Sequence, residues 1–185
     1  MHSLGKLAVI LGVTCLAAPA IYGVEVRVDF DSSVNFSAFS TFSFMDGTLA
    51  EDLEVEARIH AAIERELIPL GLREVREDPD LYIVTHASLE PEKWIETVDY
   101  DYWVGYEGFK KPIEAAVETW GGEAGMLLVD ILEASSQRLI WRGLATGNVA
   151  KTSEKRDRKL DKTMAQLFGD FPPKYKNKSK ASDGD

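Results

Sequence analysis

Acidic side chains are the main candidates for chemistry in this 185-residue chain. Asp78 and Asp80 flank a proline, and such a carboxylate pair could serve acid–base catalysis or metal binding. The same pattern is also typical of a turn that leads into a strand. Asp99 and Asp101 form a second pair, but the sequence places neither pair in one cleft with a partner acid or base. A hydrolase is therefore the weakest functional hypothesis, and we expect no catalytic residue.

Histidine and cysteine are scarce, which limits metal and thiol chemistry. The chain has three histidines and one cysteine, Cys15. His60 lies beside an apolar helical stripe and His86 on a predicted strand, and an isolated histidine in either place usually has a structural role. The sequence has no Gly-rich phosphate loop after a strand, no HExxH or CxxC motif and no Gly-x-Ser-x-Gly elbow. We therefore expect no metal and no cofactor.

The first 20 residues have the layout of a secretory signal peptide. Lys6 precedes an uncharged run over residues 7–24, and Ala18 and Ala20 provide the small residues required for cleavage before Ile21. An uncleaved anchor is the alternative, because the run just reaches the length of a short membrane span. Lipidation of Cys15 is a third possibility, although the residues before it match a lipoprotein signal poorly. We expect an exported protein of the periplasm or envelope, attached to a membrane only through such an N-terminal anchor.

Composition indicates a globular domain and excludes one class of partner. The chain is 45% hydrophobic and 28% charged, with a formal net charge of −10. This acidity disfavours binding to nucleic acid phosphates. Residues 174–185 are polar and aperiodic, which is typical of a frayed tail. We expect one domain over residues 24–173.

The periodicity of this domain predicts its fold class. Strands are expected at residues 24–31, 36–44 and 81–88, and a hairpin within residues 125–149. Helices are expected in residues 45–72 and 152–173. Their apolar stripes are Val55, Ile59, Ala62, Ile63, Leu67 and Leu70 in the first, and Leu160, Met164, Leu167, Phe168 and Phe171 in the second. The order predicts an α+β fold, a mostly antiparallel or mixed β-sheet with two helices packed on one face as a two-layer sandwich.

The hairpin has two faces of different character. One register places Ile131 opposite Trp141 and Asp130 opposite Arg142, and burial should select it over a one-residue slip. Trp141 then belongs to the core with Phe171, whereas Asp130 and Arg142 form an exposed pair. Truncation of a buried Trp costs about 3–5 kcal/mol, and an exposed ion pair contributes roughly 0–1 kcal/mol. We therefore expect Trp141→Ala to lower the melting temperature far more than Arg142→Ala.

A candidate binding surface combines the second hairpin face with an aromatic connection. The hairpin supplies Leu128, Leu132, Ile140, Arg142 and Leu144, which are too apolar for a fully solvated face. Residues 89–124 supply Trp94, Tyr100, Tyr102, Trp103, Tyr106, Phe109 and Trp120. The aromatic segment either covers this face or leaves it open for a partner.

Several segments together resemble a known family. They are "VEVRVDFD", "FSAFSTFSF", "LIPLGL", "DPDLYIV", "GMLLVDILEASSQRLIWRGLATG" and the closing "FPP". This order is similar to the bacterial domain of unknown function 4136, over about residues 24–173. The resemblance implies a cell-envelope protein, often of lipoprotein type. That family has no agreed activity, so the resemblance assigns no catalytic residue.

Two hypotheses of a binding function remain. The leading hypothesis is a non-catalytic periplasmic or envelope-associated interaction module that binds an envelope protein or itself through the candidate surface. The alternative is an aromatic-lined domain that binds an envelope glycan or lipid, because aromatic rings offer large contact areas with polar handles.

Overall fold

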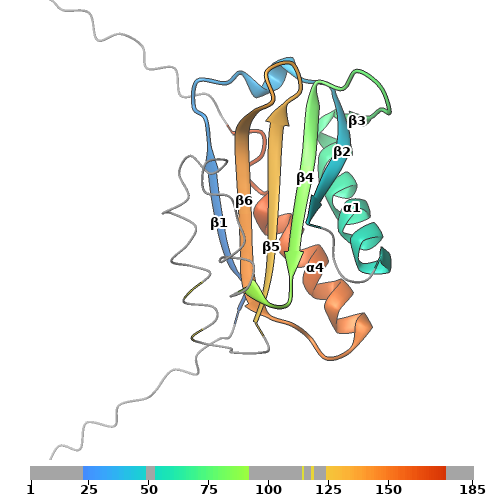
Figure 1. Cartoon of the computed structure of the whole chain (residues 1–185), viewed down its shortest axis with the longest axis vertical. Helices are drawn as coiled ribbons and strands as arrows, with labels where there is room; N and C mark the ends of the chain where they lie inside the picture. The colour runs from blue at the N-terminus through green and yellow to red at the C-terminus, as the bar shows by residue number, and fades with distance from the viewer. Residues whose placement is uncertain (1–22, 49–52, 92–113, 115–117, 119–123, 174–185) are drawn as a thin grey trace, which may run out of the picture.

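The computed structural model describes residues 23–48, 53–91, 114, 118 and 124–173, and it forms a two-layer α+β sandwich (Figure 1). The strands are β1 (Glu25–Phe30), β2 (Thr41–Thr48), β3 (Arg73–Glu74), β4 (Leu81–Ser88), β5 (Ala124–Glu133) and β6 (Arg138–Asn148), and the helices are α1 (Leu53–Leu67) and α4 (Ser153–Leu167). The predicted fold class is confirmed. The aromatic residues from Trp94 to Trp120, Cys15 and the C-terminal tail lie outside the described residues.

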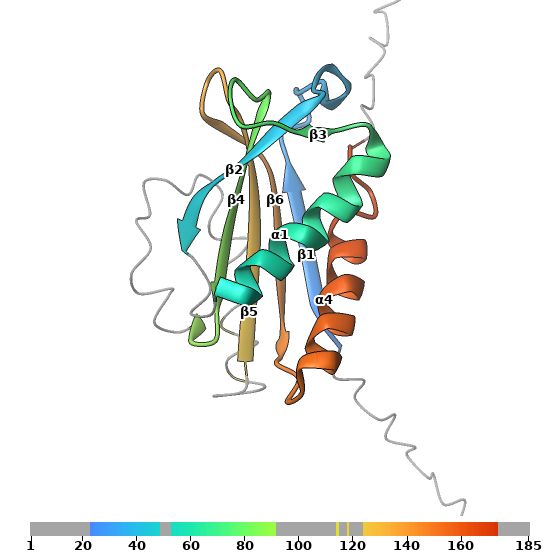
Figure 2. The ribbon, with the colours of Figure 1, turned by 90° about the vertical axis from the view of Figure 1, so that its right-hand side faces the viewer.

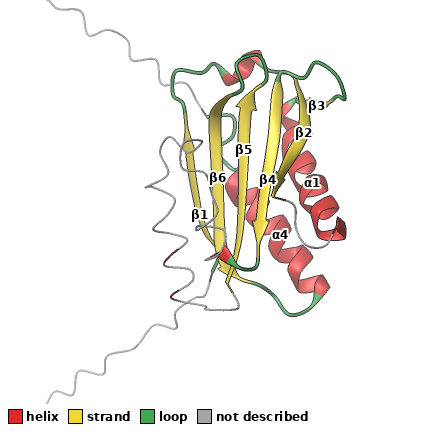
Figure 3. Cartoon of the chain, in the orientation of Figure 1, coloured by secondary structure: helices red, strands yellow, loops and turns green. Residues whose placement is uncertain are grey.

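The sheet is mixed, with the order β1-β6-β5-β4-β2-β3. β2 runs parallel to β3 and β4, and the other neighbours are antiparallel. Both helices cover one face of this sheet, as Figures 2 and 3 show. Within the described residues, no helix is long and apolar enough to cross a membrane.

The core lies between the helices and the sheet. Ile59, Ile63 and Leu67 of α1 and Met164 and Leu167 of α4 are buried in one hydrophobic cluster with the strands. The stripe of α1 ends earlier than its sequence indicates. The α-helix ends at Leu67, a 3-10 turn (Ile68–Leu70) follows, and Leu70 is exposed.

Trp141 is the centre of the aromatic part of this core. It is 1% exposed, and its ring stacks on Phe168 with a centroid distance of 5.1 Å and meets Phe171 edge-on at 5.7 Å. Gly143 makes room for the indole, because a Cβ at this position would lie 2.5 Å from the Trp141 ring. The core roles expected for Trp141 and Phe171 therefore match their burial.

The predicted hairpin register is confirmed, since Asp130 lies opposite Arg142 and Ile131 opposite Trp141. The placement of Ile140 on the second face is wrong. The register shifts after Ile131, so that Leu132 pairs with Leu139 and Ile140 is an extra residue in β6. Such a bulge interrupts strict alternation. Ile140 accordingly belongs to the same core cluster as Trp141.

The outer face, defined as the sheet face opposite the helices, is buried rather than open. Its residues Leu128, Asp130, Leu132, Arg142 and Leu144 are 0–3% exposed. This face is therefore covered, which is one of the two alternatives that the sequence leaves open, and the expectation of an exposed ion pair is wrong. Arg142 donates from Nε to Asp130 Oδ1 and from Nη2 to Oδ2, each at 2.6 Å. This is a bidentate, buried charge pair.

Burial reverses the expected cost of truncating Arg142. Breaking a buried pair leaves one uncompensated charge, so Arg142→Met and Asp130→Leu should each lower the free energy of unfolding by about 3–5 kcal/mol. The double variant should lose less than either single variant, because no charge is left unpaired. Urea denaturation at neutral pH measures the free energy of unfolding of all three variants. Arg65→Met, at the exposed Arg65–Asp161 pair, is the control and should cost less than about 1 kcal/mol. Additive losses in the double variant would contradict the prediction.

Candidate binding cavity

The acidic pair that could do chemistry has a structural role in this fold. Asp80 Oδ2 accepts hydrogen bonds from the backbone amides of Ser40 at 2.8 Å and Thr41 at 3.0 Å, and from the Ser40 hydroxyl at 3.1 Å. The Ser40 amide is the main cause of the lowered pKa of Asp80. Asp78 has a positive φ of 49° and belongs to the turn before β4. Asp80 thus fixes the start of β2 beside the start of β4.

The two histidines in the described part of the chain also contact structural neighbours. His60 stacks on Phe44 with a centroid distance of 3.8 Å, and its Nε2 lies 3.1 Å from Glu56 Oε1. Glu56 is itself buried and accepts a hydrogen bond from the Thr85 hydroxyl at 2.6 Å. No group of three or more His, Cys, Asp or Glu residues in the described ranges is arranged to hold a metal ion.

His86 lies on the outer face, opposite Leu128 in the sheet. Burial lowers the pKa of His86, and Arg142 acts in the same direction, whereas Asp130 and Glu56 oppose the shift. The imidazole is therefore held in its neutral form at neutral pH. This assigns His86 to the packing of the outer face.

A cavity of about 550 Å³ is the concave feature that could hold a ligand. It lies between α1 and α4, which separate toward their N-termini (Figure 2), and against the ends of β4, β5 and β6. Its apolar lining includes Val55, Ile59, Ala87, Leu89, Leu127, Val149 and Leu160. The volume falls in the range of small-molecule sites, about 300–1,000 Å³.

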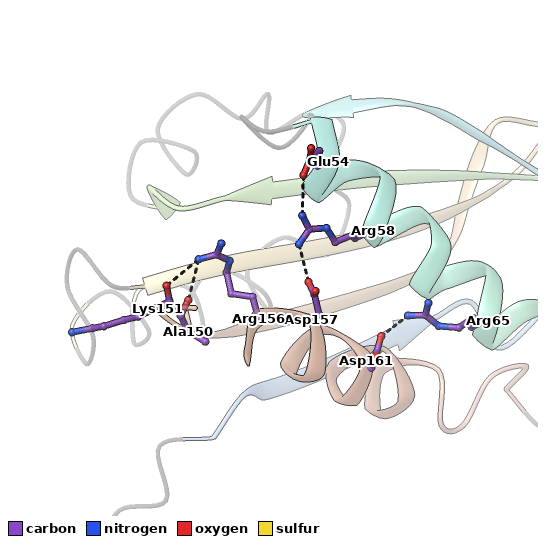
Figure 4. A network of polar contacts seen from close by, with 8 residues as sticks. All are labelled: Glu54, Arg58, Arg65, Ala150, Lys151, Arg156, Asp157 and Asp161. Atoms are coloured by element: carbon purple, nitrogen blue, oxygen red, sulfur yellow. Dashed lines mark hydrogen bonds and ion pairs between the residues drawn. The ribbon is translucent and has the colours of Figure 1, made fainter. Parts of the chain in front are cut away.

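Charged side chains also line the cavity, among them Arg58, Arg156 and Asp157, whose polar contacts Figure 4 shows. Arg58 bridges the two helices, since it donates to Asp157 at 2.9 Å and to Glu54 at 3.2 Å. Arg156 donates to the carbonyl oxygens of Ala150 and Lys151, at 3.3 and 3.4 Å.

Lys159 lies one helical turn from Arg156 and also lines the cavity. Its ammonium donates to the Asn148 backbone carbonyl and, at 2.6 Å, to Asn148 Oδ1. Partial burial lowers the pKa of Lys159. The cavity therefore combines an aliphatic interior with cations at its edge.

The candidate binding residues that the structure describes lie outside the cavity. Of the candidate binding residues, the structure describes Leu128, Leu132, Ile140, Arg142 and Leu144, and none of them lines it. The available signal was weak: Arg156, Lys159, Leu160 and Thr163 share one face of α4 at helical spacing. Nothing in the sequence indicates that α1 and α4 would separate at this end.

The fold and cavity together define an α+β sandwich with a ligand-sized, mainly aliphatic pocket between its two layers. The chain belongs to the family described as domain of unknown function (DUF4136), whose model matches residues 26–173. No curated protein matches the chain.

The chain is similar to solved structures at low sequence identity. A PDZ domain protein from Parabacteroides distasonis ATCC 8503 is 19% identical, with a TM-score of 0.53 over 82% of this chain. The match covers 37% of that protein, so this chain spans little more than a third of its length. A dodecamer of a PelC point variant and a PelC dodecamer, both from Paraburkholderia phytofirmans, are 11% and 9% identical, with TM-scores of 0.44 and 0.47. Each of these covers 78% of this chain and 96% or 94% of PelC.

Protonation of His86 should make the protein less stable in mild acid. Because the folded-state pKa of His86 lies below the unfolded value of about 6.5, the unfolded state binds more protons between the two pKa values. The contribution to the free energy of unfolding is complete above the unfolded pKa and is lost as the pH falls toward the folded pKa. The slope cannot exceed about 1.4 kcal/mol per pH unit for one proton.

Urea denaturation between pH 7.5 and 5 measures this loss. His86→Gln should flatten the pH dependence, while His60→Gln, the control, should keep it. The window avoids the acidic range in which Asp31 and Asp80, whose pKa values are lowered, begin to take up protons. An unchanged slope in His86→Gln would show that another group is responsible.

Proposed function

We propose that this chain is a non-catalytic binding module of the bacterial cell envelope, and that its cavity takes up an alkyl chain. The observation that carries the proposal is the 550 Å³ cavity with its aliphatic lining. Its N-terminal segment, with the layout of a signal peptide, and the resemblance to envelope proteins support the location. The structural roles of Asp80, His60 and His86 support a binding role over a catalytic one.

The character of the lining favours an alkyl ligand over a glycan. Glycan rings are commonly held by stacking on aromatic side chains, which offer flat apolar faces. The described residues that line the cavity include no Phe, Tyr or Trp. Each methylene transferred from water into such a lining contributes about 0.8 kcal/mol. A ligand of several methylenes therefore gains more here than a hydroxylated ring would.

Filling the cavity should abolish uptake of an apolar probe. The probe is N-phenyl-1-naphthylamine, whose fluorescence rises when it leaves water. Val55 lines the cavity from α1, and Val55→Trp should weaken binding at least about tenfold, since displacing two methylenes already costs about that much. Leu53→Trp is the matched control, because Leu53 is 74% exposed on the same helix and does not line the cavity.

Circular dichroism and thermal melting establish that both Trp variants remain folded. Loss of probe binding in Val55→Trp alone supports the proposal. No binding to the wild-type chain, or equal binding to both variants, would contradict it.

One specific observation supports the interaction-module hypothesis: strand β1 lies at the edge of the sheet. Within the described residues, no strand pairs with its outer edge, and Val28 and Phe30 are each 42% exposed. The Asp31 amide donates to the Ile140 carbonyl of β6, at 2.9 Å. Because the direction of backbone groups alternates along a strand, the N–H and C=O groups of Val28 face away from β6. An exposed edge of this kind is a template for another strand.

The centre of β1 is complementary to a second copy of itself. In an antiparallel pairing of two copies with Val28 opposite Val28, Arg27 of each copy lies opposite Asp29 of the other. The same register places Glu25 opposite Asp31, two like charges, and within each copy these carboxylates are already paired with Arg27 and Arg138. Opposite charges at directly paired positions stabilise a sheet by roughly 0.2–1 kcal/mol each. The geometry therefore supports, as a second candidate function, self-association that extends the sheet across two copies.

A charge exchange tests this pairing. Arg27→Asp or Asp29→Arg alone places like charges opposite each other in the dimer and should shift it toward monomer. The double variant restores opposite charges and should recover the dimer. Light scattering after size exclusion, over a range of protein concentrations, measures the mass. A monomer at all concentrations, or a dimer unaffected by either single variant, would reject self-pairing through β1.

A further inference from the structure

We propose that the ligand of the cavity is an anionic amphiphile, with its alkyl chain in the cavity and its acidic head group bound by Arg156 and Lys159. This inference rests on the proposed function and specifies the ligand class. The acidic group is a carboxylate or a phosphate, which share the chemistry that a guanidinium and an ammonium recognise.

The first observation is the position of the two cations. Arg156 and Lys159 are three residues apart on α4, so they are neighbours on one helical face, and both line the cavity. Lys159 is half-buried and Arg156 is exposed. They therefore lie where the apolar interior meets solvent, which is where the head group of a buried alkyl chain would lie.

The second observation is that neither cation has a counter-ion among the residues that the structure describes. Three other arginines of the two helices have carboxylate partners: Arg58 with Asp157, Arg65 with Asp161, and Arg158 with Glu154. In the part of the chain that the structure describes, Arg156 and Lys159 bind only neutral oxygen atoms, from Ala150, Lys151 and Asn148. A half-buried ammonium with only neutral acceptors has lost part of its hydration without gaining an opposite charge.

The third observation is that the charge at the cavity has the opposite sign to that of the protein. The chain has a net charge of −10, yet the described cavity residues include three cations, Arg58, Arg156 and Lys159, against two carboxylates, Glu90 and Asp157. Asp157 is already paired with Arg58. An anion would therefore meet a locally favourable field on an otherwise repulsive surface.

The experiment compares three ligands with the same alkyl chain and different head groups. Dodecanoate, dodecyl phosphate and dodecanol are titrated into the full chain at pH 7.5, the anions below their micelle concentrations and the alcohol below its solubility limit. Displacement of N-phenyl-1-naphthylamine measures the binding of each. At least one of the two anions should bind about tenfold or more tightly than dodecanol, because a hydrogen bond to a charged group contributes enough for such a difference. The ratio of dodecanoate to dodecyl phosphate affinity distinguishes the carboxylate from the phosphate.

Matched variants on α4 assign the effect to the two cations. Lys159→Met and Arg156→Met remove the charge and keep an apolar stem, and each should reduce anion affinity about tenfold and dodecanol affinity by much less. Lys162→Met and Arg158→Met are the controls, because these residues are exposed on the same helix and do not line the cavity. Both controls should bind all three ligands as the wild type does. Thermal melting verifies that each variant is folded.

The outcomes separate the inference from the proposed function. Equal affinity for the alcohol and both anions, or anion binding that is insensitive to Lys159→Met and Arg156→Met, overturns the head-group assignment and leaves an apolar cavity in place. Failure of all three ligands to displace the probe from wild-type protein overturns the alkyl-binding function itself. Selective loss of anion binding in the two cation variants supports the inference.

Discussion

The charge pair between Asp130 and Arg142 is the constraint on which the rest of the sheet depends. Both residues are almost fully buried in the two long central strands. A slip of one residue would place the carboxylate among the side chains that pack against the helices, with its guanidinium partner on the opposite face. Only one register keeps both charges together. β4 and β1 pair with the outer sides of this hairpin, so the register extends from Asp29, opposite Arg142, to Val84, opposite Asp130. A buried ion pair is weak evidence for net stability, but here it distinguishes one pairing from its neighbours.

The same register, with a bulge at Ile140, determines how α4 lies on the sheet. The bulge brings Ile140 and Trp141 into the same core, and Gly143 leaves space for the indole. Phe168, just after α4, then stacks on Trp141, so the C-terminal end of the helix is held by aromatic packing. The N-terminal half of α4 is rich in charged residues and is linked to α1 through the Arg58–Asp157 pair. Apolar packing at one end and polar bridging at the other leave the cavity between the two helices.

The sequence predicts those features that depend on local periodicity. Alternation gives the strands, helical spacing gives the stripes of α1 and α4, and the opposite charges give the hairpin register. The misplacement of Ile140 has a physical cause, since a bulge breaks the period of two that the prediction assumes. The burial of Arg142 depends on what covers the outer face, which is a tertiary property. The cavity is formed by α1, α4 and the ends of three strands, segments distant in sequence, so no single motif contains it.

The distribution of charge on α4 makes a purely structural role for Arg156 and Lys159 difficult to sustain. Acidic residues outnumber basic ones by 31 to 21 in this chain, so potential partners are abundant. Asp157 lies beside Arg156 in the sequence, yet its carboxylate bonds across the helix gap to Arg58. Lys159 is half-buried, and its acceptors within the described ranges are neutral, although a position one turn away could carry a carboxylate at little cost to the helix. A side chain that only stabilised the fold would gain from such a partner. If the cation at the mouth of the cavity binds an acidic ligand, such a partner would weaken that binding, because an internal carboxylate would compete with the ligand for the ammonium. The absence of a counter-ion in the described part of the chain therefore supports the proposed anion binding.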